Sequence, residues 1–353
     1  MDAGAEVAWK QRKRPDELSA IQNAMNLLYR DRPAFFAEYQ NDPIEQKDES
    51  EKILTADEIS AKLSKIDRGA VAVEWSHVTA FIDVQKEALY WVVCAWGANF
   101  SGGVIDYGCF PEQGRPYFSY GDLSRKLSSE FPGKSEEAVI YAGLSALVNE
   151  LCSRTWMRED GTALRIEKLL IDQGYQTDTI HQFCRQSPFG GIVMPAKGKG
   201  IKAGMKPLNE YKTGQAEKAR GEKAGMNWRI STVEGRSVRF VLVDTNEWKK
   251  FLFSRLATSQ GSAGCLSLFG SDASKHRLFA DQLTSEYAVK TFGNGRDVLE
   301  WYPRPEHKDN HWFDATVGCA VAASIVGCGL PESGGTIRPR KPRVALAEMG
   351  RAS

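Results

Sequence analysis

The chain has 353 residues, of which 42% are hydrophobic, 26% charged and 10% aromatic, a composition typical of a globular protein with one or two domains. No apolar run reaches the length of about 18 residues that a membrane span needs, and the polar, basic first residues lack the apolar core of a secretory signal. The 46 Lys and Arg residues nearly balance the 45 Asp and Glu residues, so the net charge of +1 neither requires nor excludes a nucleic-acid partner.

The seven cysteines form no C-x-x-C pair, and several of them lie in apolar runs such as the one around Cys94. Free cysteine in such a run behaves as a small hydrophobic residue. The pattern indicates a reducing, cytosolic compartment and argues against a zinc ribbon.

Residues 1–48 have the pattern of an N-terminal helical arm or linker. Aromatic residues follow the apolar positions, and the helix signal stops at Asp42–Pro43. Such an arm cannot bury its apolar face alone, so we expect it to dock on another surface. The apolar positions with helical spacing are Leu18, Ile21, Met25 and Leu28.

A domain over residues 49–330 is predicted from a change to alternating and short apolar runs. It opens with a short helix that starts at Thr55, where Thr55 and Glu58 give a capping-box sequence, and ends near Gly69. Three strands with short, meander-like connections follow, and then a helix, a fourth strand, a second helix and a fifth strand. These elements are expected at 77–85, 88–98, 102–110, 135–153, 165–174, 177–186 and 190–196.

The rest of the chain alternates basic and apolar segments. A Lys- and Gly-rich loop is predicted at 196–226, a β-hairpin at 227–245 and a helix at 247–257. A late helix of small and apolar residues at 313–326 suits close packing on a sheet. Residues 331–353 read as a basic, disordered tail, and further basic clusters lie at 10–14 and 338–343.

Three aspartates stand where a carboxylate is costly to bury. Asp83 lies inside the first predicted strand, Asp172 ends the fourth strand, and Asp314 opens the late helix. Divalent cations take carboxylate oxygens from residues that are far apart in sequence. Two such ions about 3.5–4 Å apart can activate a water and stabilise the leaving oxygen in phosphodiester cleavage.

Each aspartate also has a purely structural interpretation. Asp172, shortly before a glycine, resembles a turn residue, and Asp314 in a first helical turn is favoured by the helix dipole without any metal. Asp83 is the hardest to explain in this way. The three together, in this order, are more informative than any one of them.

Two other features carry less weight. Asp106 is either a fourth acid of the site or, in the simpler interpretation, directed at solvent or a sheet edge. His307 and His311 have the spacing of a zinc pair, but no cysteine pair accompanies them, so a pair of loop histidines is preferred. His311 precedes Asp314 by three residues and is kept outside the catalytic set.

The order of elements and acids resembles the ribonuclease H-like nuclease fold, with aspartates on the first strand, the fourth strand and the late helix. Five segments narrow the resemblance to the nuclease half of a tailed-phage terminase large subunit of the lambda-like type. They are PAFFAEYQNDP, FIDVQ, LLIDQGY, FADQLTSEY and HWFDATVGCAVAA, and the resemblance spans about Asp16 to Gly327.

The resemblance implies an α/β domain with a central mixed sheet, flanking helices and an inserted hairpin. It implies an endonuclease that cuts concatemeric double-stranded viral DNA during genome packaging in the cytoplasm of a bacterial host cell. Carried over residue by residue, Asp83, Asp172 and Asp314 would be the catalytic carboxylates that hold two Mg²⁺ or Mn²⁺ ions. In-line attack by an activated water would then leave a 3′-hydroxyl and a 5′-phosphate.

The resemblance also implies partners. Besides double-stranded DNA, these are the capsid portal, a small terminase subunit and an ATPase domain or subunit. The Lys-rich loop would lie near the duplex, where backbone contacts make affinity strongly salt-dependent, although a solvated loop is an equal alternative. The candidate DNA-binding residues are Lys197, Lys199, Lys202 and Lys206.

One departure concerns the packaging ATPase, which needs a Walker A loop, G-x-x-x-x-G-K-[ST]. The nearest match, Ser128–Ser135, has Ser128 in place of the first glycine and follows no apolar strand. We interpret it as a loop and helix cap, so the chain resembles a nuclease portion that would not translocate DNA by itself.

Two alternatives stay open beside the terminase nuclease. One is another ribonuclease H-like enzyme, such as a junction resolvase or integrase, which would prefer branched or end-specific DNA. The other is a non-catalytic packaging assembly module in which the acids are relics. Divalent-metal binding distinguishes that module from a nuclease.

Overall fold

A computed structural model describes residues 17–30, 35, 39, 54–211, 214–219, 221–232, 238–305 and 309–330. The chain divides into two units, residues 1–53 and 54–353. The described part of the first unit holds helix α1 (Ala20–Arg30), as the helical spacing of its apolar residues predicts. The predicted basic clusters at 10–14 and 338–343 and the tail at 331–353 lie outside the described residues.

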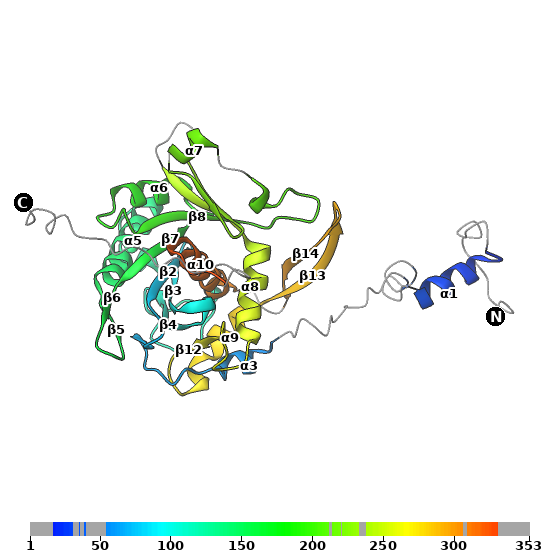
Figure 1. Cartoon of the computed structure of the whole chain (residues 1–353). Coiled ribbons are helices and arrows are strands. Elements are labelled where there is room, and N and C mark those ends of the chain that lie inside the picture. The colour runs from blue at the N-terminus through cyan, green and yellow to red at the C-terminus, as the bar shows by residue number, and fades with distance from the viewer. Residues whose placement is uncertain are drawn as a thin grey trace, which may run out of the picture. The chain divides into compact units, whose positions relative to one another are not determined.

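The second unit is built on one mixed sheet (Figure 1), with nine strands among the described residues. In spatial order they are β12 (Leu266–Leu268), β4 (Gly102–Phe110), β3 (Leu89–Trp96), β2 (His77–Val84), β7 (Ile166–Asp172), β8 (Val193–Lys199), β11 (Arg239–Asp244), β10 (Trp228–Thr232) and β9 (Lys223–Gly225). Strands β2, β3 and β4 form the predicted antiparallel meander, and β7, β8 and β11 continue the sheet parallel to β2. The five predicted strands are therefore present, and the carboxyl ends of β2, β7 and β8 meet at one edge of the sheet.

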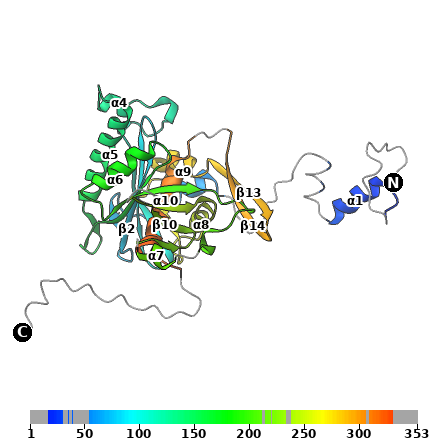
Figure 2. The ribbon, with the colours of Figure 1, turned by 90° about the horizontal axis from the view of Figure 1, so that it is seen from above.

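Helices cover both faces of the sheet (Figure 2). The predicted helices α5 (Glu136–Ser153) and α6 (Thr177–Gln186) pack on one face. On the other face lie α8 (Thr245–Ala257), α9 (Arg277–Leu283) and α10 (His311–Val326). Because successive side chains of a strand point to opposite faces, Ile82 joins the core beneath α5, and Phe81 joins the core beneath α10.

Helix α10 lies unusually close to strand β2. A Cβ atom added at Gly318 would lie only 1.8 Å from the ring of Phe81, so the helix needs a residue without a side chain there. The small residues predicted to suit close packing therefore bring α10, and Asp314 with it, against the central strands.

The remaining elements lie outside the main sheet and its covering helices. A three-stranded sheet, counted within the described ranges, lies apart from the main one, as does the hairpin of β13 and β14, which protrudes from the unit (Figure 1). In the part of the chain that the structure describes, the helices α3, α4 and α7 and four 3₁₀ turns are also present. Their bounds are α3 (Ala56–Ser60), β1 (Ala70–Val71), η2 (Ala98–Phe100), η3 (Tyr120–Asp122), α4 (Leu127–Glu130), β5 (Trp156–Arg158), β6 (Ala163–Leu164), η4 (Leu208–Glu210), α7 (Gln215–Ala219), η5 (Ala273–His276), β13 (Glu286–Gly293) and β14 (Arg296–Pro303).

Two predicted caps are confirmed, but one helix is shorter than predicted. Thr55 and Glu58 form a capping box at α3, and Ser135 caps α5 as the interpretation of Ser128–Ser135 requires. Helix α3, which was predicted to end near Gly69, ends at Ser60. The chain turns extended there because the backbone N–H of Ser64 donates to the carbonyl of Leu268, beside the sheet.

The segment at 196–226 is more regular than the predicted loop. Strand β8 continues to Lys199 because it pairs with β11, up to the partners Lys199 and Asp244. The turn η4, the helix α7 and the edge strand β9 follow in the same segment. The predicted hairpin at 227–245 is present as β10 and β11, and its tip at 233–237 lies outside the described residues.

None of the helices in the described ranges combines the length and the apolar character that crossing a bilayer would require. All seven cysteines are buried as free thiols, as their apolar surroundings predict.

Candidate active site

The structure brings the three predicted aspartates to one place. Ile82 of β2 pairs in register with Ile171 of β7, so Asp83 and Asp172 follow side by side at the ends of parallel strands. Both face the side of the sheet that α10 covers, and Asp314 lies in the first turn of that helix. All three line a cavity of about 290 Å³ whose walls include the glycines at the end of β8 and the small residues of α10.

The carboxylates in this cavity perturb one another. Burial first, and then the negative charges of Asp83 and Asp314, raise the pKa of Asp172 to about 7. Two backbone N–H groups oppose this rise, among them the N–H of Gly174, which donates to Oδ2 of Asp172 at 3.1 Å. Negative charge is therefore in excess around Asp172, which is the condition under which a cation or a proton is bound.

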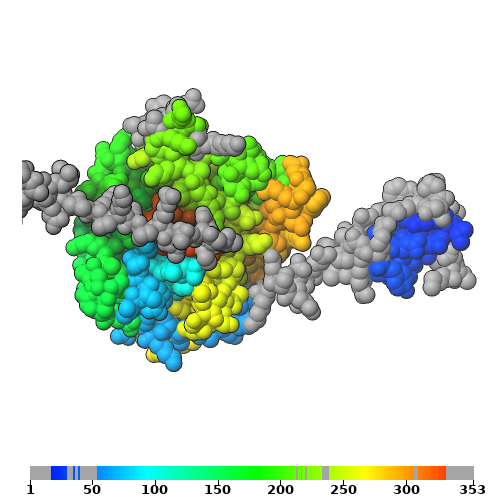
Figure 3. All heavy atoms as spheres, viewed as in Figure 1, coloured from blue at the N-terminus to red at the C-terminus, as the bar shows by residue number. Residues whose placement is uncertain are grey.

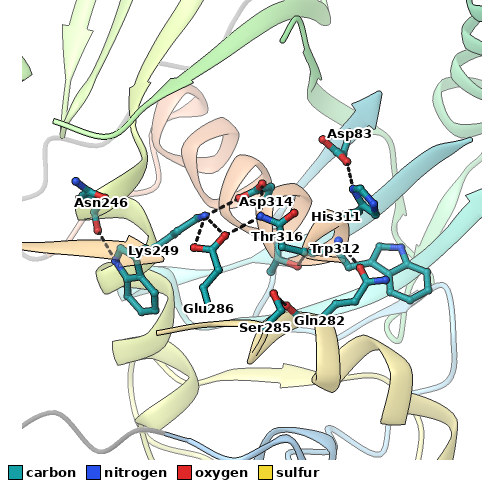
Figure 4. Close-up of polar contacts among 12 residues, drawn as sticks. Asp83, Asn246, Lys249, Gln282, Ser285, Glu286, His311, Trp312, Asp314 and Thr316 are labelled. Carbon is teal, nitrogen blue, oxygen red and sulfur yellow. Dashed lines mark hydrogen bonds and ion pairs between the residues drawn. The ribbon is translucent and has the colours of Figure 1, made fainter. Parts of the chain in front are cut away.

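Lys249, on α8, neutralises part of this charge (Figure 4). Its Nζ atom lies 2.7 and 2.8 Å from the two carboxylate oxygens of Glu286 and 2.9 Å from Oδ1 of Asp314. Asn310 joins the two acids by donating to Oε1 of Glu286 and to Oδ2 of Asp314. Burial works against the charge on Lys249, but the two carboxylates more than offset it and raise its pKa.

Asp314 is held by this network and still faces the cavity, since 37% of its side chain is exposed. Burial raises its pKa, whereas the ammonium of Lys249 acts to lower it. The carboxylate is thus oriented by two donors, Lys249 and Asn310.

Asp83 is oriented by a histidine. His311 donates through Nδ1 to Oδ2 of Asp83 at 2.8 Å, and Gln85 donates to the same oxygen at 3.0 Å. The imidazole stacks on the ring of Tyr90, with the ring centroids 4.3 Å apart. Burial lowers the pKa of His311, but Asp83, together with the charges of Asp309 and Asp314, more than compensates, and the net direction is upward.

His311 is therefore no loop histidine, because it is the first residue of α10 and is buried. The other histidine of the predicted loop pair, His307, lies outside the described residues. Asp106 also differs from its simpler interpretation. It is buried away from solvent and binds Arg68 at 2.6 Å and Arg154 at 2.7 Å, which makes it part of a structural ion triad.

The sequence-based search missed Lys249 and Glu286. A signal for Lys249 was present, since it stands three and seven residues before Leu252 and Leu256, on the buried face of its helix. Glu286 lies in the segment FADQLTSEY that carries the family resemblance, but no residue pattern assigns it to the site, and its partners are 24 to 37 residues away in the chain.

The four candidate DNA-binding lysines are all exposed on or after β8. Lys197 and Lys199 belong to the strand, and the side chains of Lys202 and Lys206 project from the segment that follows. Lys202 lies 3.8 Å from Glu300 of the β13–β14 hairpin.

Within the described ranges, no three His, Cys, Asp or Glu side chains lie close enough together to hold a metal ion as they stand. Three carboxylates line the cavity, but two of them already have a protein partner. Asp83 is hydrogen-bonded to His311, and Asp314 is paired with Lys249. Carboxylate oxygens are the donors that hard cations prefer.

The class of the protein follows from these features. An antiparallel meander extended by parallel strands, with carboxylates at the strand ends and on the covering helix, defines the ribonuclease H-like nuclease fold, as predicted. The chain belongs to the family described as terminase large subunit gpA, endonuclease domain, which matches residues 36–332. The resemblance noted in the sequence is confirmed by this match.

Solved structures similar to the chain include nuclease domains of the large terminase subunit of bacteriophage Sf6. One, a variant described with calcium, is 12% identical with a TM-score of 0.40; another, without a named ligand, is 16% identical with a TM-score of 0.38. A third, a variant described with manganese, is 11% identical with a TM-score of 0.40. Each comparison covers 76% of this chain and 97% of the other. A comparison with curated protein sequences gave no match.

Proposed function

We propose that the chain is a metal-dependent endonuclease that cuts double-stranded viral DNA during genome packaging. The observation that carries the proposal is the single cavity lined by Asp83, Asp172 and Asp314, three carboxylates from three separate elements. Membership of the terminase endonuclease family supports it.

The proposed cofactors are two Mg²⁺ or Mn²⁺ ions held by these three aspartates. The fit rests on the donor set, since carboxylate oxygens suit hard cations and the site has more negative charge than Lys249 neutralises. Manganese is also named for the Sf6 nuclease domain. When bound, such cations activate a water and stabilise the leaving oxygen of a phosphodiester.

The protein groups prepare the site for this chemistry. His311 and Gln85 fix the orientation of Asp83, and Asn310 and Lys249 fix that of Asp314. Asp172, with its raised pKa, holds a proton near neutral pH until a cation replaces it. Glu286 keeps Lys249 charged and in place, so it is proposed as a positioning residue.

We further propose the surroundings in which this activity operates. The DNA is concatemeric viral DNA in the cytoplasm of an infected bacterium, and translocation is supplied by an ATPase domain or subunit outside the nuclease domain. The capsid portal and a small terminase subunit are the other proposed partners. Residues 1–48 are proposed to act as an arm or linker toward them, and 49–330 as the nuclease domain.

Cleavage of supercoiled plasmid by the purified chain tests the activity and its central ligand together. We expect nicking or linearisation with Mg²⁺ or Mn²⁺ and none with chelator. The Asp83→Asn variant should lose at least about 100-fold in rate while remaining folded, because an amide is a poor ligand for a hard cation.

A matched control is Asp67→Asn, which changes an exposed aspartate in the loop before β1. It should cleave like the wild type. Wild-type activity in Asp83→Asn would refute the assignment. A folded chain that neither cleaves DNA nor binds Mn²⁺ would favour the assembly module, and preference for four-way junctions over linear duplex would favour a resolvase.

A further inference from the structure

A second hollow lies on the face of the sheet opposite the carboxylates. Its volume is about 230 Å³, and it lies beside the strands β8, β11 and β10. The alternation of the strands separates the two sites, because Gly198 and Gly200 line the carboxylate cavity and Lys199, between them, lines the second hollow. We name this hollow the basic pocket; its lining is Lys199, Ile201, Met205, Lys206, Leu208, Tyr211, Arg229, Ser231 and Leu242.

The charged side chains that line the basic pocket are all basic. Lys199, Lys206 and Arg229 line it, and no acidic residue is among the described residues of the lining. Neither lysine forms an ion pair with any residue in the described ranges. Because Glu217 and Glu222 pair with Arg229, the uncompensated positive charge of the basic pocket is that of Lys199 and Lys206, and an anion that enters would neutralise it.

Arg229 and the aromatic ring give the basic pocket its form. Arg229 pairs with Glu217 at 3.0 Å and with Glu222 at 3.6 Å, while its Nε atom is buried without a hydrogen-bond partner. Its guanidinium carbon lies 5.9 Å from the ring centroid of Tyr211, and Nζ of Lys206 lies 4.7 Å from the same centroid. Lys206 and Arg229 thus share one aromatic ring, which holds both side chains beside the basic pocket.

The segment 202–204, next to the basic pocket, is hydrogen-bonded to the β13–β14 hairpin. Arg296 of β14 donates to the carbonyls of Lys202 and Ala203, and the side chain of Asn294 donates to the carbonyl of Gly204. Figure 3 shows this green segment beside the orange hairpin. The basic pocket is therefore built by residues fixed in the fold, in contrast to lysines on a free loop.

We propose that the basic pocket binds a backbone phosphate of the duplex, away from the phosphate that is cut, and so positions the DNA over the carboxylates. The inference rests on the proposed nuclease function. It follows from the shared end of β8, since a duplex presents a phosphate about every 1.7 Å along its axis and can reach both faces of that strand end. Phosphate oxygens match the guanidinium and ammonium donors, and Ser231 adds a hydroxyl.

Binding of a fluorescent duplex of about 20 base pairs to the full chain in EDTA tests the proposal without cleavage, over about 50 to 200 mM salt. Lys199→Gln and Lys206→Gln should each weaken binding about 3- to 10-fold and reduce the salt slope by about 1. Lys206→Arg should bind nearly as the wild type because the charge is kept. The control is Lys134→Gln, an exposed lysine before α5, which should leave binding unchanged.

A phosphate group in the basic pocket could come from the duplex or from a small free molecule. Calorimetric titration with inorganic phosphate and with deoxyadenosine monophosphate distinguishes these two sources. Weak binding of both, together with loss of duplex affinity in the glutamine variants, supports the duplex. Tight binding of the mononucleotide that Lys206→Gln abolishes, with duplex affinity unchanged, would overturn the duplex assignment. Equal duplex affinity and salt slope in wild type, Lys199→Gln and Lys206→Gln would overturn the basic pocket altogether.

Plasmid cleavage keeps this proposal distinct from the nuclease. If the wild type cleaves, Lys206→Gln should raise KM with little change in kcat, because the basic pocket does not touch the reacting phosphate. If the wild type binds duplex through the basic pocket but does not cleave under any metal condition, the nuclease fails and the basic pocket stands.

Discussion

The carboxyl of Asp172 titrates near neutrality, and this gives the site a defined pH dependence. Its pKa of about 7 in the folded chain compares with about 3.9 for an unfolded aspartate, so the folded state holds a proton that the unfolded state releases. The stabilisation from this proton is complete below about pH 4 and is lost as the pH rises through 7. Without metal, we expect the free energy of unfolding to fall between about pH 4 and 7, and to level off above pH 7, relative to Asp172→Asn.

Urea unfolding in EDTA measures that difference directly, since the asparagine does not titrate. Because a cation competes with the proton, the apparent affinity for Mn²⁺ should also fall about tenfold per pH unit below 7 in the wild type. A wild-type affinity that is flat across this range, or parallel stability curves for the two chains, would contradict the raised pKa.

Lys249 is the residue whose removal tests the buried ion network. Lys249→Met should destabilise the metal-free chain by about 3–5 kcal/mol, because Glu286 is buried and Asp314 loses its cation. The double variant Lys249→Met/Glu286→Gln should regain part of this loss, since an amide replaces the unpaired carboxylate. Denaturant unfolding of the four chains of this cycle checks both expectations; a single variant as stable as the wild type would show that the ion pairs contribute nothing.

At the scale of elements, the approach of α10 to β2 decides whether the carboxylates share a cavity. Gly318→Ala places a methyl group within the ring of Phe81, so we expect a loss of about 1–3 kcal/mol and a weaker affinity for Mn²⁺. Gly191→Ala is the control, because a Cβ there meets open space at an ordinary backbone angle. Phe81→Leu should rescue Gly318→Ala if the clash is the cause, and the absence of any rescue would place the effect elsewhere.

Some of the strands could be predicted from the sequence and others could not. The strands β2, β3, β4 and β7 were predicted almost to the residue because their apolar runs are bounded by charges and glycines. The segment after Ala196 was predicted as a loop, because its lysines carry no apolar alternation and only pairing with β11 makes it a strand. The hairpin β13–β14 was missed for a similar reason, since exposed residues such as Phe292 interrupt its alternation.

For the whole molecule, the order of elements along the chain predicts some residues of the site but not the residues that contact them in space. The three aspartates could be predicted as a set because each lies in an element, two strands and a late helix, whose place in the fold follows from the chain order. The partners of those aspartates could not, because the contacts of Lys249 with Glu286 and of His311 with Asp83 join residues 37 and 228 positions apart. The basic pocket likewise depends on Arg229 and Tyr211, which meet only after β10 has folded onto the sheet.

Alternate residues at the end of strand β8 line the carboxylate cavity on one face of the sheet and the basic pocket on the other. Ala196, Gly198 and Gly200 open space among the carboxylates, and Lys199 points the opposite way. A slip of β8 by a single residue against β7 would exchange the faces, placing an ammonium among the three aspartates and removing it from the basic pocket. Both sites therefore depend on the register of one strand, so a one-residue insertion or deletion within it is expected to disable cutting and DNA positioning in a single step.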